Sequence, residues 1–137
     1  MLFRSKLEAL LDLNWGADIN EVVDSFLLAP LTDFLKRPGK KIRGRMVEIG
    51  FELATGKSTS QWTPQEKTVL LQASELLEAL HAASLIIDDI QDDSEQRRGE
   101  PTVHRKHGMP LALNAGNWLY FWPLQNVETW DVSPSVK

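Results

Sequence analysis

The sequence predicts an all-α protein whose helices pack side by side as a bundle. Apolar residues recur every three or four positions through most of the 137 residues, and this is the period of a helix that buries one face. The longest such stretch, 63–94, lasts about thirty residues and would form a helix about 45 Å long. No alternation of apolar and polar residues, as in a half-buried strand, competes with this helical pattern. We therefore expect one helical domain over residues 1–137.

The composition is that of an ordinary soluble chain, with 42% hydrophobic and 25% charged residues. A net charge of −4 and a pI near 5.3 disfavour nucleic-acid binding. The absence of cysteine excludes disulfides and thiolate metal sites. We expect no signal peptide in the amphipathic first fifteen residues, and no apolar run approaches the roughly 20 residues of a membrane span. These features predict a cytoplasmic location and no transmembrane segment.

Two helices are expected in the first part of the chain. One covers 3–13, and the next covers about 18–36, where Pro30 should kink or interrupt it. The segment KRPGKK at 36–41 breaks the helical pattern. A third helix is expected from 42 to about Gly56, a residue type that commonly ends helices.

The helix over 63–94 has the clearest start. Thr63 is a favourable N-cap, Pro64 takes the first helical position, and Glu66 completes a capping box. After Gly99 and Pro101 have ended this helix, a last one is expected at 110–122, before Pro123. The tail 126–137 has no clear period and is expected to be irregular.

Four aspartates crowd the end of the long predicted helix. Asp88 and Asp92 are four residues apart, so they share one helix face; Asp89 and Asp93 form a second such pair. Like charges at this spacing, close to a helix C-terminus, are destabilising. A divalent cation would reverse that cost, and a set of oxygen ligands without cysteine or histidine suits Mg²⁺. The alternative is a solvated acidic helix end, but the preceding LHAASLII is almost wholly apolar.

Basic residues lie close to this cluster in the sequence or at the start of an earlier helix. Arg97 and Arg98 follow the aspartates directly, and arginine binds phosphate through two parallel hydrogen bonds. Lys40 and Arg43 lie at a helix start just after a glycine, where free N–H groups also favour anions. Alone, GKKIRGR would be read as a solvated basic turn. Together with the acidic helix it suggests two anion sites, one bridged by metal and one held directly by lysine and arginine.

These segments resemble the trans-isoprenyl diphosphate synthases, the family that includes farnesyl, geranylgeranyl and longer polyprenyl diphosphate synthases. The match lies in GKKIRG followed by ALHAASLIIDDIQDDSEQRRGEPTVHRKHG, in which DDIQD fits the motif DDxxD and is followed by RRG. It covers about residues 36–122. The resemblance implies an all-α fold with a central cavity, and head-to-tail condensation of isopentenyl diphosphate with an allylic diphosphate. It implies Mg²⁺ as cofactor, helping the allylic diphosphate to depart before the alkene attacks the carbocation.

Site residues can be carried over from the resemblance one by one. Asp88 and Asp92 would be Mg²⁺ ligands, Asp89 would support them, and Arg97 would contact the allylic diphosphate. The residues expected to hold isopentenyl diphosphate are Lys40, Arg43, His81 and Arg98. The alternative for His81 is a histidine satisfied within a helix interface.

Two small residues precede the aspartate motif, and they bear on product length. Ala83 and Ser84 stand where bulky aromatics in this family close the product pocket early, so the resemblance implies products of about C20 or longer. His104 and His107 are three residues apart and could bind metal, but no carboxylate partner is near in the sequence, so surface or loop packing is the expectation.

The chain departs from the family in several ways. Family members are more than twice as long and carry a second aspartate-rich motif; after residue 93 there is only the lone Asp131, so the bundle looks truncated. Gly44 replaces a proline of many relatives. Apolar faces, notably the stretch containing Trp118, Leu119, Phe121 and Trp122, would be exposed. The chain is therefore expected to self-associate or to pair with another prenyl synthase subunit, although these aromatics could also form an ordinary core.

Three other functions stay open beside a polyprenyl diphosphate synthase of the geranylgeranyl type. The chain could be a catalytically deficient partner or regulatory subunit of a full-length synthase. It could be a relative of the terpene cyclases, although GKKIRG and RRG favour the condensing enzymes. It could also be a general Mg²⁺ or diphosphate-binding module.

Overall fold

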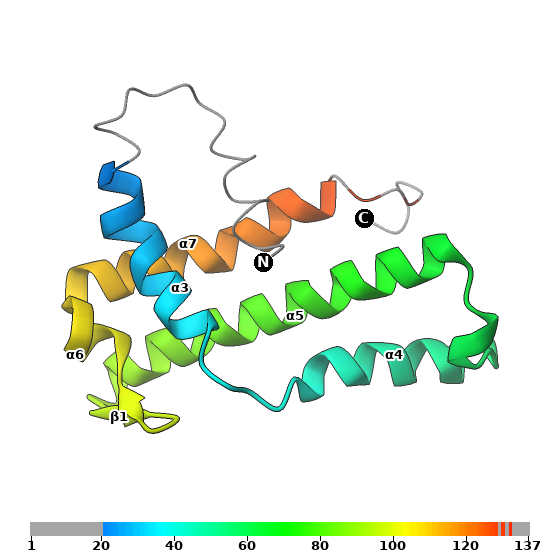
Figure 1. Ribbon diagram of the computed structural model, residues 1–137, viewed down its shortest axis with the longest axis horizontal. Coiled ribbons are helices and arrows are strands. Elements are labelled where there is room, and N and C mark those ends of the chain that lie inside the picture. Colours follow the sequence, from blue (N-terminus) through cyan, green and yellow to red (C-terminus); the bar gives the residue numbers. More distant parts are fainter. Residues whose placement is uncertain (1–20, 129, 131, 133–137) are drawn as a thin grey trace.

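The computed structural model describes residues 21–128, 130 and 132. The helix expected at 3–13 lies outside these residues. The long helix α5 (Pro64–Gln91) is the centre of the fold (Figure 1). α4 (Ile42–Thr55) lies along its first half, and α7 (Met109–Glu128) runs antiparallel along the rest. α3 (Ala29–Leu35) crosses near α7. The all-α bundle is confirmed.

The regular α-helical pattern is interrupted just before Pro30. Residues 21–23 are helical, and a π-turn, η1 (Asp24–Leu28), leads into α3. The N–H of Ala29 bonds to the carbonyl of Asp24, five residues back. Pro30 has no N–H to donate and its ring needs room beside the preceding turn, so a wider turn relieves both constraints. The predicted interruption is confirmed.

The two central helices begin and end as local chemistry dictates. α4 ends at Thr55, and the C-cap residue Gly56 has φ of +69° and donates its N–H to the carbonyl of Glu52. A single 3₁₀ turn, η2 (Thr59–Gln61), follows. At the start of α5, the Thr63 hydroxyl accepts from the Glu66 N–H at 3.2 Å, and the Thr63 N–H donates to the Glu66 carboxylate at 2.7 Å. The predicted capping box is confirmed.

α5 ends at Gln91, three residues before the expected Ser94. Asp93 has φ of +49°, its N–H bonds to the carbonyl of Ile90, and the Ser94 N–H bonds to that of Asp89. This is a Schellman-type ending with aspartate in the left-handed position that glycine usually takes. The prediction that Asp93 is a helical residue, paired with Asp89 on one face, is therefore wrong.

A small hairpin and a short helix were not predicted. β1 (Gln96–Arg97) pairs antiparallel with β2 (Glu100–Pro101). The two residues between them, Arg98 and Gly99, have φ of +57° and +81°, the signs that a type I′ turn requires. The sequence pattern did not reveal this two-stranded hairpin, because arginine at such a turn gives a weak signal. α6 (Val103–His107) follows the hairpin.

The last helix also differs from its prediction. α7 continues through Pro123 to Glu128, so residues 126–128 of the expected irregular tail are helical; beyond them only the bends at Trp130 and Val132 are described. Pro123 removes one helical hydrogen bond, but it and Asn126 are buried. Tertiary packing of this face therefore outweighs the local preference to stop.

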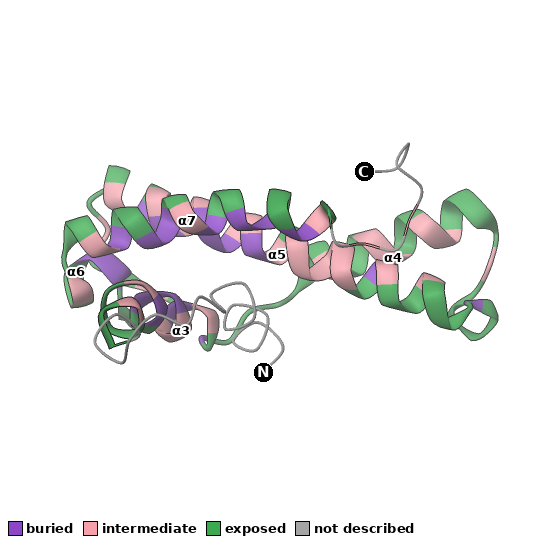
Figure 2. Ribbon diagram, turned by 90° about the horizontal axis from the view of Figure 1, so that it is seen from above, coloured by how far each residue is buried: buried purple, intermediate pink, exposed green. Residues whose placement is uncertain are grey.

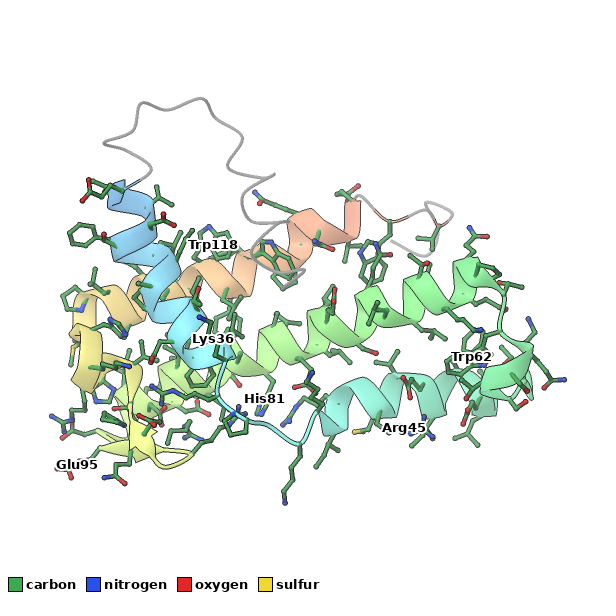
Figure 3. All side chains as sticks on the ribbon, viewed as in Figure 1. Lys36, Arg45, Trp62, His81, Glu95 and Trp118 are labelled. Atoms are coloured by element: carbon green, nitrogen blue, oxygen red, sulfur yellow. The ribbon has the colours of Figure 1, made fainter. Side chains whose placement is uncertain are left out.

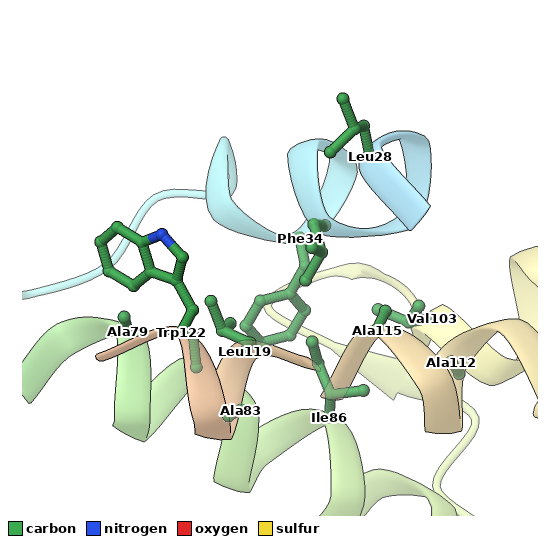
Figure 4. Packing of buried hydrophobic residues seen from close by; sticks show 12 residues of the cluster. Leu28, Phe34, Ala79, Ala83, Ile86, Val103, Ala112, Ala115, Leu119 and Trp122 are labelled. Atoms are coloured by element: carbon green, nitrogen blue, oxygen red, sulfur yellow. The ribbon is translucent and has the colours of Figure 1, made fainter. Parts of the chain in front are cut away.

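The core lies where α3, α5 and α7 meet. Figure 4 shows Phe34, Ile86 and Leu119 at its centre. α7 approaches α5 closely because Gly116 has no side chain: a Cβ there would lie 2.8 Å from Ile87 Cδ1. The other buried apolar members of the cluster are Leu28, Leu31, Ala79, Ala82, Ala83, Val103, Ala112, Ala115 and Trp122.

The predicted exposure of the aromatic stretch is only partly right. Leu119 and Trp122 are buried in the core and Trp118 packs against it, whereas Phe121 is 66% exposed. The more continuous exposed apolar face belongs to α4, which buries no residue of its own (Figure 2). Its exposed side chains recur at intervals of four, three and four: Ile42, Met46, Ile49 and Leu53.

Among the described residues, α5 alone is long and apolar enough to cross a membrane by length and composition. Core helices of soluble proteins meet the same criterion. α5 packs against α4 and α7 and carries the charged or polar side chains described next.

Candidate functional site

The acidic end of α5 separates its aspartates into two kinds. Asp88 and Asp92 are both exposed and stay one turn apart, because the Asp92 N–H bonds to the Asp88 carbonyl at 2.8 Å. Within the described residues neither carboxylate forms an ion pair. Asp93 lies outside the helix and binds Arg105 at 2.8 Å. The structure therefore leaves one exposed carboxylate pair.

Asp89 faces the interior and is only 1% exposed. Its Oδ1 accepts a hydrogen bond of 2.7 Å from Nε of Arg97, while its Oδ2 is buried without a hydrogen-bond partner among the described residues. The buried carboxylate of Asp89 thus fixes the orientation of the Arg97 side chain. The terminal N–H groups of Arg97 can bind an anion, because this bond uses Nε alone.

Two exposed carboxylates fit the way proteins hold Mg²⁺, which takes one or two carboxylates and completes its shell with water and phosphate oxygens. Asp88 and Asp92 meet this requirement, and Asp89 does not because it is buried against Arg97. No group of three or more histidine, aspartate or glutamate side chains converges on a metal-sized site within the described residues.

A basic pocket of about 110 Å³ lies two turns earlier along α5. His81 lines it from α5 beside the connection between α3 and α4 (Figure 3). Arg98 reaches it from the hairpin turn. The remaining lining residues are Phe34, Leu35, Arg37, Gly39, Lys41, Glu78 and Ala82. Residues from three distant segments therefore form one cavity with several cationic groups.

The residues expected to hold isopentenyl diphosphate are only partly brought together. His81 and Arg98 line the pocket, whereas Lys40 and Arg43 are exposed and do not; Lys41 lines it instead. Lys41 occupies the left-handed region with φ of +47°, a conformation that the sequence did not reveal. Arg43 is nonetheless near enough for its charge to act on His81.

The surroundings of the pocket lower the pKa of His81 and so favour its neutral form. Burial lowers the pKa of His81 below its usual 6.5, and the charges of Arg43, Arg98 and Arg97 lower it further, while Glu78 opposes them. A neutral imidazole can still donate one hydrogen bond to a phosphate oxygen. The positive field that disfavours imidazolium is the same field that would attract an anion.

Sequence reasoning missed Arg37, a buried arginine that lines the same pocket. Its guanidinium donates to Asp33 at 2.7 Å and to the Arg97 carbonyl at 3.3 Å. Burial raises the pKa of Asp33, but hydrogen bonds and charges from Lys106 and Arg37 outweigh it and leave that pKa below its usual value. The only local signal was a basic residue where the helical pattern breaks.

The remaining predicted residues lie apart from the pocket. Ala83 is fully buried in the core, and Ser84 is half-buried with its hydroxyl donating to the His81 carbonyl at 2.8 Å. His104 is buried, and its Nε2 lies 3.9 Å from Asp93; Nε2 of His107 lies 3.9 Å from Asp33. Each histidine thus has a carboxylate nearby in space, which the sequence spacing did not show.

An exposed carboxylate pair and a basic pocket two turns away on the same helix are suited to binding phosphate groups, one through a divalent cation and one through arginine. The chain belongs to the polyprenyl synthetase family, which it matches over residues 24–136. It is 38% identical over 104 residues to a geranylgeranyl pyrophosphate synthase of Mucor circinelloides f. lusitanicus, covering 76% of this chain and 31% of that protein. It is also 37% identical over 120 residues to a geranylgeranyl pyrophosphate synthase of Apiospora sacchari, and this match covers 86% of this chain and 33% of that protein.

Solved structures agree with the sequence relatives. A geranyltranstransferase from Thermotoga maritima superposes with a TM-score of 0.61 at 28% identity, over 90% of this chain and 41% of that one. A geranylgeranyl pyrophosphate synthetase from Geoglobus acetivorans superposes with a TM-score of 0.60 at 27% identity. This superposition covers 97% of this chain and 38% of that one. The chain thus spans about a third of the length of the curated relatives that it matches.

Proposed function

We propose that this chain provides the first aspartate motif and the basic anion site of a prenyl diphosphate synthase, which joins isopentenyl diphosphate to an allylic diphosphate. The observation that carries the proposal is the arrangement along α5. The exposed pair Asp88 and Asp92 lies two turns beyond the pocket of His81 and Arg98, about 10 Å along one rigid helix. Two diphosphates can therefore be held side by side, one through metal and one by cationic side chains.

Magnesium would be held by Asp88 and Asp92. When bound, it neutralises the diphosphate and stabilises the charge that develops as the carbon–oxygen bond breaks. Arg97, held by Asp89, binds the departing diphosphate through its terminal N–H groups. Arg98 and neutral His81 hold the second diphosphate, and the exposed cations Lys40 and Arg43 add positive charge without lining the pocket.

The reaction balances without any further reactant. The bond from the allylic carbon to the diphosphate oxygen breaks, and the diphosphate leaves with the electron pair. The alkene of isopentenyl diphosphate forms the new carbon–carbon bond, and the resulting cation gives up one proton to the released diphosphate. We propose a product of about C20 or longer, because relatives of this chain include geranylgeranyl pyrophosphate synthases and Ser84 is small.

Product length is better tested at Ser84 than at Ala83. Ala83 is fully buried in the core, so an aromatic there would disturb packing whatever its effect on a product. Ser84 is only half-buried. We expect Ser84→Phe to shorten the product, as judged by its mass.

A second function is favoured by the exposed face of α4 and by the presence of only one carboxylate pair in the described residues. The chain would then be a partner subunit, in a homo-oligomer or with another prenyl synthase, acting in the cytoplasm. A protein that exposes a continuous apolar helix face commonly covers it with a partner. Size measurement, and product analysis after mixing with a full-length geranylgeranyl synthase, test this function.

The deciding experiment incubates the purified chain with isopentenyl diphosphate, several allylic diphosphates and Mg²⁺, with a chelator control, and identifies products by mass spectrometry. Elongated diphosphates that vanish with chelator support condensation. A hydrocarbon product without elongation would indicate a cyclase instead. Neither product, combined with no binding of inorganic pyrophosphate, would refute the proposal; pyrophosphate binding without product would favour the partner subunit.

A further inference from the structure

The basic pocket is assembled from segments that are distant in the sequence, and Arg37 is where they join. Arg37 Nη1 donates to the Arg97 carbonyl, sixty positions away, at 3.3 Å. In return, Arg98 Nη1 donates to the Arg37 carbonyl at 3.3 Å. The connection after α3 and the hairpin turn are therefore held together by a reciprocal pair of hydrogen bonds, both made by arginine side chains.

The guanidinium of Arg37 is fixed rather than free to follow a ligand. It is buried, with the side chain only 5% exposed, and its Nη2 forms an ion pair of 2.7 Å with Asp33 one turn earlier. Asp33 also binds Lys106 from α6. Burying a charge is costly unless it is paired, and this one is paired on one side and hydrogen-bonded on the other.

Phe34 holds the two arginines at equal distances. The guanidinium carbons of Arg37 and Arg98 each lie 5.7 Å from the centre of its ring, within the range of a cation–π contact. Arg98 is also close to Gly39, where a Cβ would lie 3.0 Å from its Nη1. The direction of the Arg98 side chain is thus set by the α3 end and the segment that follows it.

We propose that Arg37 is a positioning residue that acts through Arg97 and Arg98, locking the hairpin turn against the connection between α3 and α4 so that the anion pocket is preformed. Its own charge is engaged by Asp33, so the anion is bound by Arg98 and its neighbours. The proposal rests on the proposed function, because it assumes that the pocket binds a diphosphate. Lysine cannot replace Arg37, because one ammonium lacks the planar fork that reaches both partners.

The test measures binding of inorganic pyrophosphate to the full chain by calorimetry, with chelator present so that the carboxylate pair does not contribute. We expect Arg37→Met to raise the Kd about ten-fold, the usual effect of losing a charged hydrogen bond. Arg98→Met should act similarly, and Arg37→Lys nearly as strongly as Arg37→Met. Arg45→Met, which removes an exposed arginine that pairs with Glu48 and does not line the basic pocket, is the matched control and should leave the Kd unchanged.

A double-mutant cycle separates positioning from direct binding. If Arg37 acts through Arg98, the variant carrying both Arg37→Met and Arg98→Met should bind no more weakly than the weaker single variant. Losses that multiply would overturn the proposal, and so would an unchanged Kd in Arg37→Met. Pyrophosphate binding that is absent in the wild-type chain would overturn both this inference and the proposed diphosphate site.

Hydrogen exchange gives a second, independent measurement. Arg37→Met should speed exchange of the backbone amides of residues 96–100 while leaving those of α4 unchanged. Weaker binding with unchanged exchange in the hairpin would mean that Arg37 touches the anion itself, and would overturn the positioning role. Circular dichroism checks the fold; if Arg37→Met does not fold, Arg37→Lys, which keeps the charge beside Asp33, decides the question.

Discussion

The acidic end of α5 and the basic pocket bind opposite charges and are built in opposite ways. Asp88 and Asp92 come from one helical turn, and helix geometry alone places them on one face. The pocket draws on α3, the connection after it, α5 and the hairpin turn, and depends on contacts such as that from Arg37 to Arg97. The acidic end can therefore be recognised in the sequence, whereas the pocket exists only after folding. Variants in the two regions should differ accordingly.

The largest expected effect is a difference in the free energy of unfolding between variants of two aspartates in the same motif. Asp89→Ala removes the buried partner of Arg97 and should lower the free energy of unfolding by about 3 kcal/mol, the low end for a broken buried pair because Arg97 is partly exposed. Asp92→Ala, at an exposed position without an ion pair, should change it by less than about 0.5 kcal/mol. Urea unfolding measures both. Equal losses would show that burial does not distinguish these two carboxylates.

The next effect concerns metal. Asp88→Ala should weaken Mg²⁺-dependent pyrophosphate binding by about ten-fold or more, since even the loss of a residue supporting a metal ligand has that effect, and should leave binding in chelator unchanged. Asp93→Asn is the matched control, because Asp93 is engaged by Arg105. Titration calorimetry with and without Mg²⁺ measures this difference. A loss of the same size in chelator would mean that the two regions are not separate sites.

A smaller effect links the pocket to pH. Because the folded state lowers the pKa of His81 below 6.5, the unfolded chain takes up this proton at a higher pH than the folded chain does. The free energy of unfolding should therefore be constant above about pH 7.5 and fall as pH drops through 6.5 toward the folded pKa. Pyrophosphate should raise the pKa of His81, which NMR titration can follow. In His81→Gln this part of the pH dependence should vanish; if it persists, His81 is not its cause.

The smallest effect tests a glycine contact. Gly39→Ala places a Cβ against Arg98 and should weaken pyrophosphate binding about two-fold by shifting that flexible side chain. Gly50→Ala meets nothing within 4 Å in α4, so binding should not change and the free energy of unfolding should rise by up to about 1 kcal/mol. The same calorimetry and urea unfolding serve for both. Stronger pyrophosphate binding in Gly39→Ala would contradict this prediction, because it would mean that the displaced Arg98 side chain binds the anion better than the original one.

The same contrast explains which parts of the structure could be predicted. The start of α5 depends on Thr63 and Glu66, three residues apart, and the end of α4 depends on Gly56; both were predicted correctly because the deciding contacts are local. α7 passes Pro123 because that face is buried, which no local rule anticipates. The hairpin turn places Arg98 at a positive φ that the sequence pattern would reserve for glycine or asparagine.

The candidate site divides in the same manner. Asp88 and Asp92 were predicted and are exposed together, and His81 and Arg98 were predicted and share a pocket. Arg37 and Lys41 were missed, and Lys40 and Arg43 lie outside the pocket, because the backbone of the connection determines which cation points inward. Charge type was evident from the sequence, but side-chain direction was not.

α5 also sets the distance between the two anion sites. His81 and Asp88 are seven residues apart on one uninterrupted helix, so the spacing between the two anion sites is fixed by the helical rise and twist rather than by loops. One residue inserted between them would lengthen the spacing by only about 1.5 Å, but it would turn the carboxylate pair about 100° away from the pocket. The intervening turns can therefore accept substitutions of different size and polarity. A single insertion or deletion there would instead move the carboxylate pair and the pocket onto different faces of the helix.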